Sequence, residues 1–153
     1  MRFTKWGEYG LLFCVHLAKN PSQQTLASEL ARAHEIPTQY AQQILHRLKK
    51  GGIVTSNRGP KGGYLLVKSP EELTAKDNLQ ASEGTTFEMM CTSNPVFDSC
   101  SHDGTPCSVR FVWETLQEKI DDALSEISLA KIVASDRGVR LVQLGRRDNV
   151  LGA

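Results

Sequence analysis

The first half of the chain alternates helical hydrophobic patterns with short breaks. Aromatic and aliphatic side chains recur at helical spacing over 4–19, and an Asn-Pro-Ser break follows. Two shorter patterns predict helices over 25–34 and 38–50. Thr38 is expected to cap the third helix, and Gly51-Gly52 is expected to end it. The pattern therefore predicts three helices in sequence.

A β-hairpin is predicted directly after these helices. Residues 53–55 and 64–67 have the composition of strands, and the Gly-rich run SNRGPKGG lies between them. Three helices followed by a hairpin with a flexible tip is the order of a winged-helix domain. A short helix over 74–83, ending at Gly84, is expected to complete this part.

The second half of the chain contains one long helical pattern. Residues 85–106 show no sustained periodicity, and a loop of this length is uncommon unless it is functional or clamped. From Cys107 apolar residues advance by four, three, four, three, four, which is a coiled-coil seam. A lone helix cannot bury such a stripe, so we expect it to dock on a second copy, with docking on its own N-terminal half as the alternative. The predicted dimerisation residues are Val109, Trp113, Leu116, Ile120, Ala123 and Ile127.

The expected fold class is mainly α with a small β-hairpin wing: a winged helix-turn-helix plus a long dimerisation helix. Four segments follow: a DNA-binding domain (1–84), a cysteine-bearing loop (85–107), the long helix with a short helix after it (107–135), and a tail (136–153). No apolar run approaches the length of a membrane span, and the first helix has no signal-peptide features. A cytoplasmic protein without membrane contact is expected.

Charge is divided between the halves. The net charge is +1, but residues 1–68 carry 10 basic and 3 acidic side chains, a balance of +7, whereas residues 69–153 carry 8 and 14, a balance of −6. Such an asymmetry indicates that the first half meets a polyanion. A merely solvated basic surface is the alternative that charge alone leaves open.

The third predicted helix and the hairpin tip supply a DNA-binding set. Glutamine side chains suit the edges of adenine in the major groove, and basic side chains neutralise phosphates. An arginine on a Gly-rich tip suits a narrow minor groove. With a two-fold seam, the expected partner is double-stranded DNA with a two-fold operator. The predicted contacts are Thr38, Gln39, Gln42, Gln43, His46, Arg47, Lys49, Arg58, Pro60 and Lys61.

Three of the four cysteines cluster in the second half. Cys91, Cys100 and Cys107 are spaced Cys-x8-Cys-x6-Cys, which suits an iron–sulfur cluster, a zinc site or a thiol switch. Cys14, in the first predicted helix, is expected to be a buried small hydrophobe. No nucleophile triad, phosphate loop or paired carboxylate supports an enzyme.

The run RLKKGGIVTSNRGPKGGYLLVKSPEELT, the opening MRFTKWGEYGL and the cysteine trio resemble the winged-helix iron–sulfur regulators that include IscR, NsrR and RirA. The resemblance spans roughly residues 1–135 and rests most specifically on the RGxxGGYxL segment beside the cysteines. It implies a homodimer in which the long helix crosses to the partner. It also implies a cluster bound by the loop before that helix.

The resemblance also bears on a fourth cluster ligand. IscR-like members have a His three residues after the last Cys, where this chain has Arg110. NsrR-like members use an acidic residue in the partner's first helix, and Glu8 matches it. His102 is the other candidate, and an exposed Glu8 paired only with Lys5 is the alternative. A further His that accompanies 2Fe-2S clusters is replaced by Leu12, so 4Fe-4S is favoured over 2Fe-2S.

The resemblance thus implies a homodimeric regulator, a repressor, whose DNA affinity depends on a cluster that senses nitric oxide, iron or redox state. A carboxylate is a weak ligand for iron, so its corner is expected to be the labile one. The rival hypothesis is a cluster-free regulator that uses the same cysteines as a thiol switch or to hold zinc.

Overall fold

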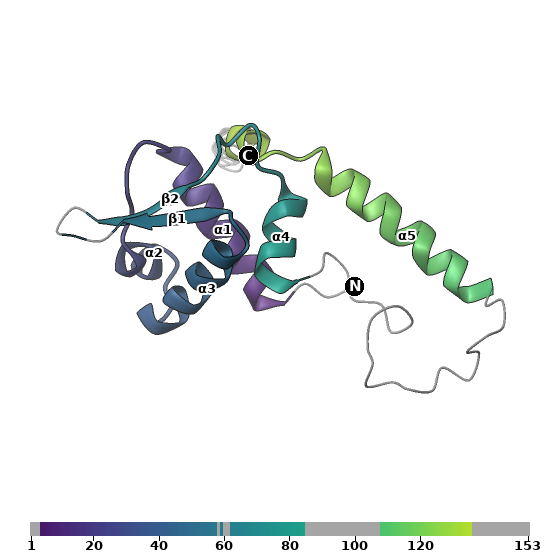
Figure 1. The fold of residues 1–153 in the computed structure, drawn as a ribbon, viewed down its shortest axis with the longest axis horizontal. Coiled ribbons are helices and arrows are strands. Elements are labelled where there is room, and N and C mark those ends of the chain that lie inside the picture. Colours follow the sequence, from purple (N-terminus) through teal and green to yellow (C-terminus); the bar gives the residue numbers. More distant parts are fainter. Residues whose placement is uncertain (1–3, 58, 60–61, 85–107, 136–153) are drawn as a thin grey trace, which may run out of the picture.

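The fold is that of a computed structural model, which describes residues 4–57, 59, 62–84 and 108–135 (Figure 1). In the described part of the chain, four helices, a hairpin and a short helical segment over 129–135 form one domain, and one long helix projects from it. The expectation of a mainly helical fold with a β-hairpin wing is confirmed. The elements are α1 (Lys5–Lys19), α2 (Ala27–Ala33), α3 (Thr38–Lys50), β1 (Val54–Asn57), β2 (Gly63–Leu66), α4 (Ala75–Glu83) and α5 (Ser108–Ser125).

Local side-chain chemistry sets the helix ends. The Thr4 hydroxyl accepts a hydrogen bond from the Trp6 amide at the start of α1. The prediction that Thr38 caps α3 is wrong: Pro37 holds the cap position and Thr38 is already helical. Proline suits this place because it has no amide hydrogen to leave unsatisfied and its φ is fixed. Gly84 ends α4 in the left-handed conformation, at φ 90°.

The two strands pair antiparallel, from Val54 opposite Leu66 to Asn57 opposite Gly63. The first strand therefore begins and ends later than the hydrophobic pattern predicted. A third segment joins the sheet, because Thr25 and Tyr64 exchange backbone hydrogen bonds of 3.1 and 2.9 Å. This pairing also delays the start of α2. A Cβ at position 63 would lie 2.9 Å from the Thr25 carbonyl oxygen, so this close approach requires the glycine.

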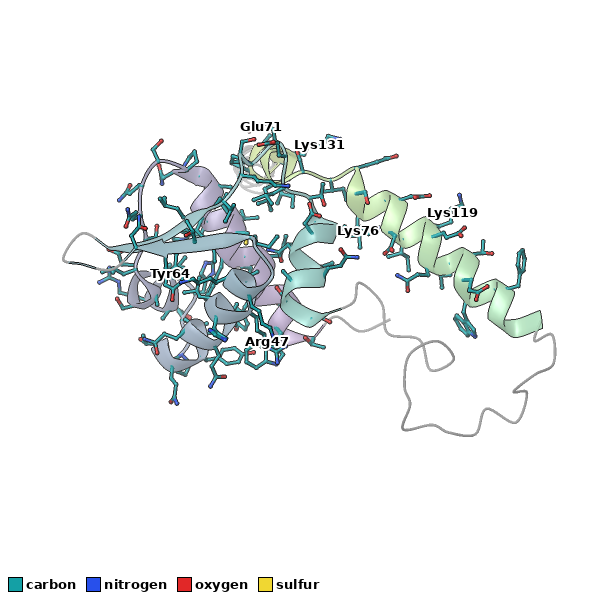
Figure 2. All side chains as sticks on the ribbon, viewed as in Figure 1. Arg47, Tyr64, Glu71, Lys76, Lys119 and Lys131 are labelled. Atoms are coloured by element: carbon teal, nitrogen blue, oxygen red, sulfur yellow. The ribbon has the colours of Figure 1, made fainter. Side chains whose placement is uncertain are left out.

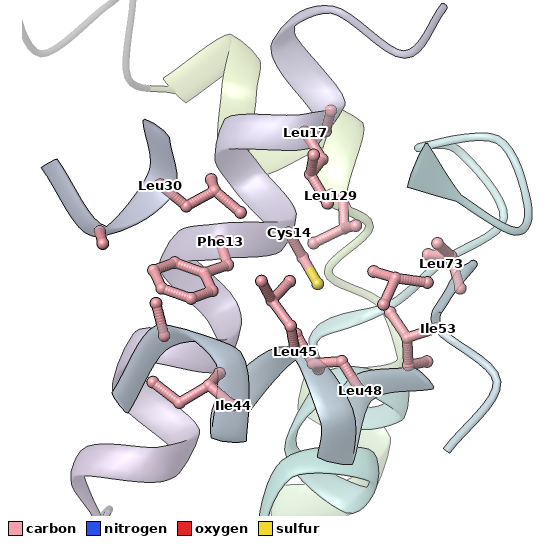
Figure 3. Close-up of a cluster of buried hydrophobic side chains, with 14 residues drawn as sticks. Phe13, Cys14, Leu17, Leu30, Ile44, Leu45, Leu48, Ile53, Leu73 and Leu129 are labelled. Atoms are coloured by element: carbon pink, nitrogen blue, oxygen red, sulfur yellow. The ribbon is translucent and has the colours of Figure 1, made fainter. Parts of the chain in front are cut away.

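One hydrophobic core lies between α1, α2, α3 and the base of the hairpin (Figure 3). It is built from the apolar stripes of the three helices, as their periodicity predicts. Cys14 is fully buried, and its sulfur points into this cluster. α4 packs closely on α1 because Gly10 has no side chain where Ser82 approaches it.

The long helix α5 projects from the domain, and the chain runs along it toward the domain. Figure 1 shows that the end of α5 that begins at Ser108 lies farthest from the domain. The helix ends at Ser125, so the prediction that Ile127 lies on it is wrong; the Ile127 carbonyl accepts a hydrogen bond from the Ala75 amide at 2.8 Å instead. Leu129 follows and is 0% exposed within the core.

Residues 129–135 are helical, where a short helix is predicted. Among the described residues, no helix combines the length and the apolar character needed to cross a bilayer. α5, the longest, alternates apolar residues with acidic and basic ones.

Candidate nucleic-acid interface

The face of α3 turned away from the core is polar. Ala41, Ile44, Leu45 and Leu48 are buried and anchor the helix in the domain. Because a helix has 3.6 residues per turn, the positions between these anchors point outward. All seven predicted contacts on α3 are exposed: Thr38, Gln39, Gln42, Gln43, His46, Arg47 and Lys49. This surface offers amide donors and acceptors, which suit base edges.

The two basic predicted contacts near the end of α3 are engaged within the protein. The Lys49 ammonium donates a hydrogen bond of 2.7 Å to the Ser56 hydroxyl of β1. The Arg47 guanidinium lies 4.3 Å from the centre of the Trp6 ring and donates a hydrogen bond of 3.0 Å to the Ser82 carbonyl. Figure 2 shows Arg47 where α3 meets α1 and α4. Arg47 therefore points toward neighbouring helices rather than along the glutamine face.

The hairpin projects from the same domain as α3 (Figure 1). Arg58, Pro60 and Lys61, predicted at its tip, lie outside the described residues. Beside the tip, the Gly62 amide donates a hydrogen bond of 2.9 Å to the Gly59 carbonyl.

Glu8 lies in the first turn of α1, on the surface of the domain. The Lys5 ammonium contacts its carboxylate at 2.8 Å, with both side chains more than half exposed. This hydrogen bond, together with the Glu8 charge, raises the pKa of Lys5. Such an exposed pair contributes little to stability and leaves the carboxylate accessible.

The other predicted cluster ligands, Cys91, Cys100 and Cys107, lie outside the described residues, as does His102. Within the described ranges no three His, Cys, Asp or Glu side chains come together as metal ligands. Of the predicted donor set the structure thus places Glu8 alone. Its exposed carboxylate is compatible with a ligand role.

An open apolar groove of about 770 Å³ runs along α1 beside α4. Glu8 lies at one end of α1 in this groove and Lys19 at the other. Apolar side chains form much of its wall, and they include Leu11, Leu12, Val15, Leu79 and Leu124. Sequence patterning does not reveal this groove, because it requires two helices far apart in the chain to pack side by side.

The predicted seam of α5 is partly exposed. Trp113 is 39% exposed and Leu116 is 40% exposed, and Ala123 is also exposed, whereas Ile120 is half-buried. Phe111 and Val112, outside the seam, are more exposed still, Phe111 at 72%. Nothing is described of the Val109 side chain. A helix with apolar residues on this much of its surface is typical of an interface.

Two histidines, His16 and His34, border the groove, and both are half-buried. The rings of His16 and His34 meet edge to face with centres 5.6 Å apart, and His34 also lies 5.4 Å from the Phe13 ring centre. Burial lowers the pKa of both, and the Lys19 charge acts in the same direction.

Burial raises the pKa of the Cys14 thiol to about 12. The sequence-based expectation that Cys14 acts as a buried small hydrophobe agrees with this placement.

The helical core, the hairpin and α3, which is the recognition helix with its polar outer face, define a winged-helix DNA-binding protein. The chain belongs to the Rrf2 family, described as "Iron-dependent Transcriptional regulator", whose match spans residues 3–135. It is 30% identical over 134 residues to an HTH-type transcriptional regulator of Aquifex aeolicus, with 87% of this chain and 92% of that protein covered. It is 29% identical to the HTH-type transcriptional regulator IscR of Photorhabdus laumondii, with 97% and 88% covered.

The fold is also that of solved regulator structures. CymR, the global cysteine regulator of B. subtilis, superposes with a TM-score of 0.69 at 24% identity, covering 88% of this chain and 98% of that one. The relatives are transcriptional regulators rather than enzymes. The chain is therefore a winged-helix transcriptional regulator.

Proposed function

We propose that this protein is a homodimeric repressor that binds a two-fold site on double-stranded DNA and whose affinity for that site is controlled by an iron–sulfur cluster. The observation that carries the proposal is the exposed glutamine-bearing face of α3 beside a hairpin wing, in a member of the Rrf2 family. Because a regulator must reach DNA, a cytoplasmic location is part of the proposal.

DNA recognition is assigned to the exposed face of α3. Gln39, Gln42 and Gln43 contact base edges in the major groove, Thr38 and His46 contact the backbone or bases, and Lys49 reaches a phosphate after leaving Ser56. Arg58, Pro60 and Lys61 of the wing enter the adjacent minor groove.

Dimerisation is assigned to α5. Two exposed apolar residues of its seam, Trp113 and Leu116, lie about one turn apart, which is about 5 Å along the helix at 1.5 Å per residue. The groove along α1 is apolar and open, so it suits such a stripe from a second copy. Val109, Ile120 and Ala123 extend the same surface, and Ile127 adjoins it from beyond the helix end.

The cluster is assigned to Cys91, Cys100 and Cys107 of one subunit and Glu8 of the partner. Glu8 is exposed, and Ser108, the residue after Cys107, lies at the end of α5 far from the domain of its own chain (Figure 1). A carboxylate from a second subunit fits this arrangement. When bound, the cluster supplies iron that reacts with nitric oxide, oxygen or chelators, and 4Fe-4S is favoured over 2Fe-2S.

A cluster-free thiol switch or zinc-binding regulator is the second candidate. The likeness to CymR of Staphylococcus aureus, whose solved structure is described as an oxidized form and is 25% identical with a TM-score of 0.66, supports this candidate. The two candidates share the DNA-binding and dimerisation surfaces and differ only in what the three cysteines hold.

Purification without oxygen distinguishes these candidates. The proposal predicts a brown protein containing iron and acid-labile sulfide, which selects a two-fold duplex from a random-sequence pool and changes its affinity when nitric oxide is added. A colourless protein with zinc or free thiols, still able to select DNA, would favour the second candidate. Failure to select any duplex would contradict both.

The ligand role of Glu8 has its own test. Glu8→Ala is expected to keep the dimer. It should change the absorption spectrum of the iron–sulfur cluster and the rate at which nitric oxide or a chelator bleaches that absorption. Glu71→Ala, which removes an exposed carboxylate elsewhere on the domain, is the matched control. A Glu8→Ala spectrum and bleaching rate equal to those of wild type would remove Glu8 from the ligand set.

A further inference from the structure

The Arg47 side chain joins three helices. It leaves α3 one turn before the helix ends, lies 4.3 Å from the centre of the Trp6 ring of α1, and donates to the Ser82 carbonyl of α4 at 3.0 Å. A planar guanidinium can stack on an aromatic face and donate in its own plane at the same time. Both of these contacts are made here, so the guanidinium is held between α1 and α4.

The Trp6 ring contacts α3 at a second point. Its centre lies 4.9 Å from the centre of the Tyr40 ring, and Tyr40 also meets Tyr9 at 5.9 Å. Tyr40 and Arg47 are seven residues apart, which is about two helical turns, so they lie on the same side of α3. One side chain of α1 therefore fixes both the position of α3 along its axis and its rotation about that axis.

The last turn of α4 holds the same two helices. Ser82 accepts the Arg47 hydrogen bond, and the next residue, Glu83, accepts hydrogen bonds from the amide and the hydroxyl of Thr4 at 3.1 and 3.0 Å. Thr4 caps α1, the helix that carries Glu8. Adjacent residues of α4 thus hold the end of α3 and the start of α1, just before the cysteine-bearing segment begins.

From this geometry, and resting on the proposed function, we infer that Arg47 is a positioning residue of the recognition helix and not a DNA contact. Its guanidinium sets the register of α3 against α1 and α4. A shift of α4's last turn, or of the turn of α1 that carries Glu8, is thereby passed to the glutamine face of α3. DNA affinity then depends on Arg47 through geometry rather than through its charge.

Salt dependence separates the two roles. Each phosphate contact contributes about 0.9 to the slope of log affinity against log salt concentration. We expect Arg47→Gln and Arg47→Lys both to weaken binding of the duplex selected by the wild-type protein about tenfold, with an unchanged slope. Lysine keeps the charge but cannot lie flat on the ring while donating to Ser82. Lys49→Gln removes a charge from the same end of α3 and is the matched comparison, with a slope smaller by about one.

Trp6→Phe is a second variant that changes no residue assigned to DNA. A smaller ring weakens the stack, so binding is expected to weaken with the slope unchanged. Trp6 and Trp113 are the two tryptophans of the chain. In a Trp113→Phe background the emission of Trp6 is therefore measured alone, and we expect it to change in both Arg47 variants while the circular dichroism of the helices stays the same.

Two results would overturn the inference. One is a slope reduced by about 0.9 in Arg47→Gln and restored in Arg47→Lys, which is the behaviour of a phosphate contact. The other is Trp6 emission that does not respond to either Arg47 variant. If the wild-type protein selects no duplex at all, the proposed function fails, and the emission of Trp6 alone then reports on whether the contact exists.

Discussion

Truncation of Leu129 tests how the end of the described chain is attached. Leu129 lies beyond α5, far along the chain from the hairpin, yet its side chain is 0% exposed in the core of the winged-helix domain (Figure 3). Its amide donates to the Leu73 carbonyl at 2.8 Å. Leu129→Ala keeps this backbone hydrogen bond and removes only the side-chain packing.

The expected cost follows from burial. Replacing a buried leucine by alanine costs about 2–5 kcal/mol, from lost transfer free energy and from the cavity left behind. Full burial places Leu129 in the middle of this range, at about 3 kcal/mol, which is a change of roughly 100-fold or more in the unfolding equilibrium. For a domain of fewer than about 100 residues the melting temperature should fall by roughly 12–24 °C.

Urea unfolding followed by circular dichroism measures this cost, with Leu116→Ala as the matched control. Leu116 is the same residue type but is 40% exposed on α5. Its truncation should weaken the dimer, so its effect should grow as protein concentration falls. The Leu129→Ala cost, within one domain, should be the same at concentrations that differ about tenfold.

A loss below about 1 kcal/mol for Leu129→Ala would refute the argument, because no buried leucine that fills a core costs so little. A cost that depends on concentration as strongly as that of Leu116→Ala would also refute it. That result would place Leu129 in the interface between subunits rather than in the core of its own domain.

Three further predictions concern the described residues. Cys14, with its pKa raised to about 12 by burial, should resist alkylation by iodoacetamide in the folded protein and react fully in urea, as mass spectrometry would detect. Burial, aided by the Lys19 charge and opposed at His16 by Glu29, lowers the pKa of His16 and His34 from 6.5. The unfolded chain therefore binds protons that the folded chain does not, so stability should fall as pH drops below 6.5 and the fall should be smaller in His34→Asn. Thr74→Ala removes the hydroxyl that accepts from the Asp77 amide and donates to the Asp77 carboxylate at the start of α4, so it should cost about 1 kcal/mol in urea unfolding, and Thr74→Ser should recover most of it.

Local patterns predicted most of the helices because their signals act over a few residues. The stripe of buried residues in α3 and the glycine after α4 mark both helices in the chain. Two of the errors occurred where tertiary contacts compete with local preference. Thr25 pairs with Tyr64 instead of starting α2, and Ile127 bonds to Ala75 instead of extending α5.

In the candidate DNA-binding site, too, local spacing placed some residues and tertiary contacts placed others. Spacing alone placed the glutamines on the outer face of α3, because the buried positions of that helix leave few other orientations. The sequence also placed Arg47 on that face, whereas the structure turns its guanidinium toward Trp6 and Ser82. A long flexible side chain at the border of a helix face follows its neighbours, and those neighbours come from distant segments.

The sequence by itself determined the order of elements, the division of charge and the residue types available for DNA and metal chemistry, since each depends on composition and spacing. Only the tertiary structure decided that Leu129 completes the core, that α1 and α4 form an apolar groove, and that the last turn of α4 contacts both α1 and α3. These features need segments far apart in the chain to meet. Such tertiary contacts are set by the packing of whole helices, which no local pattern encodes.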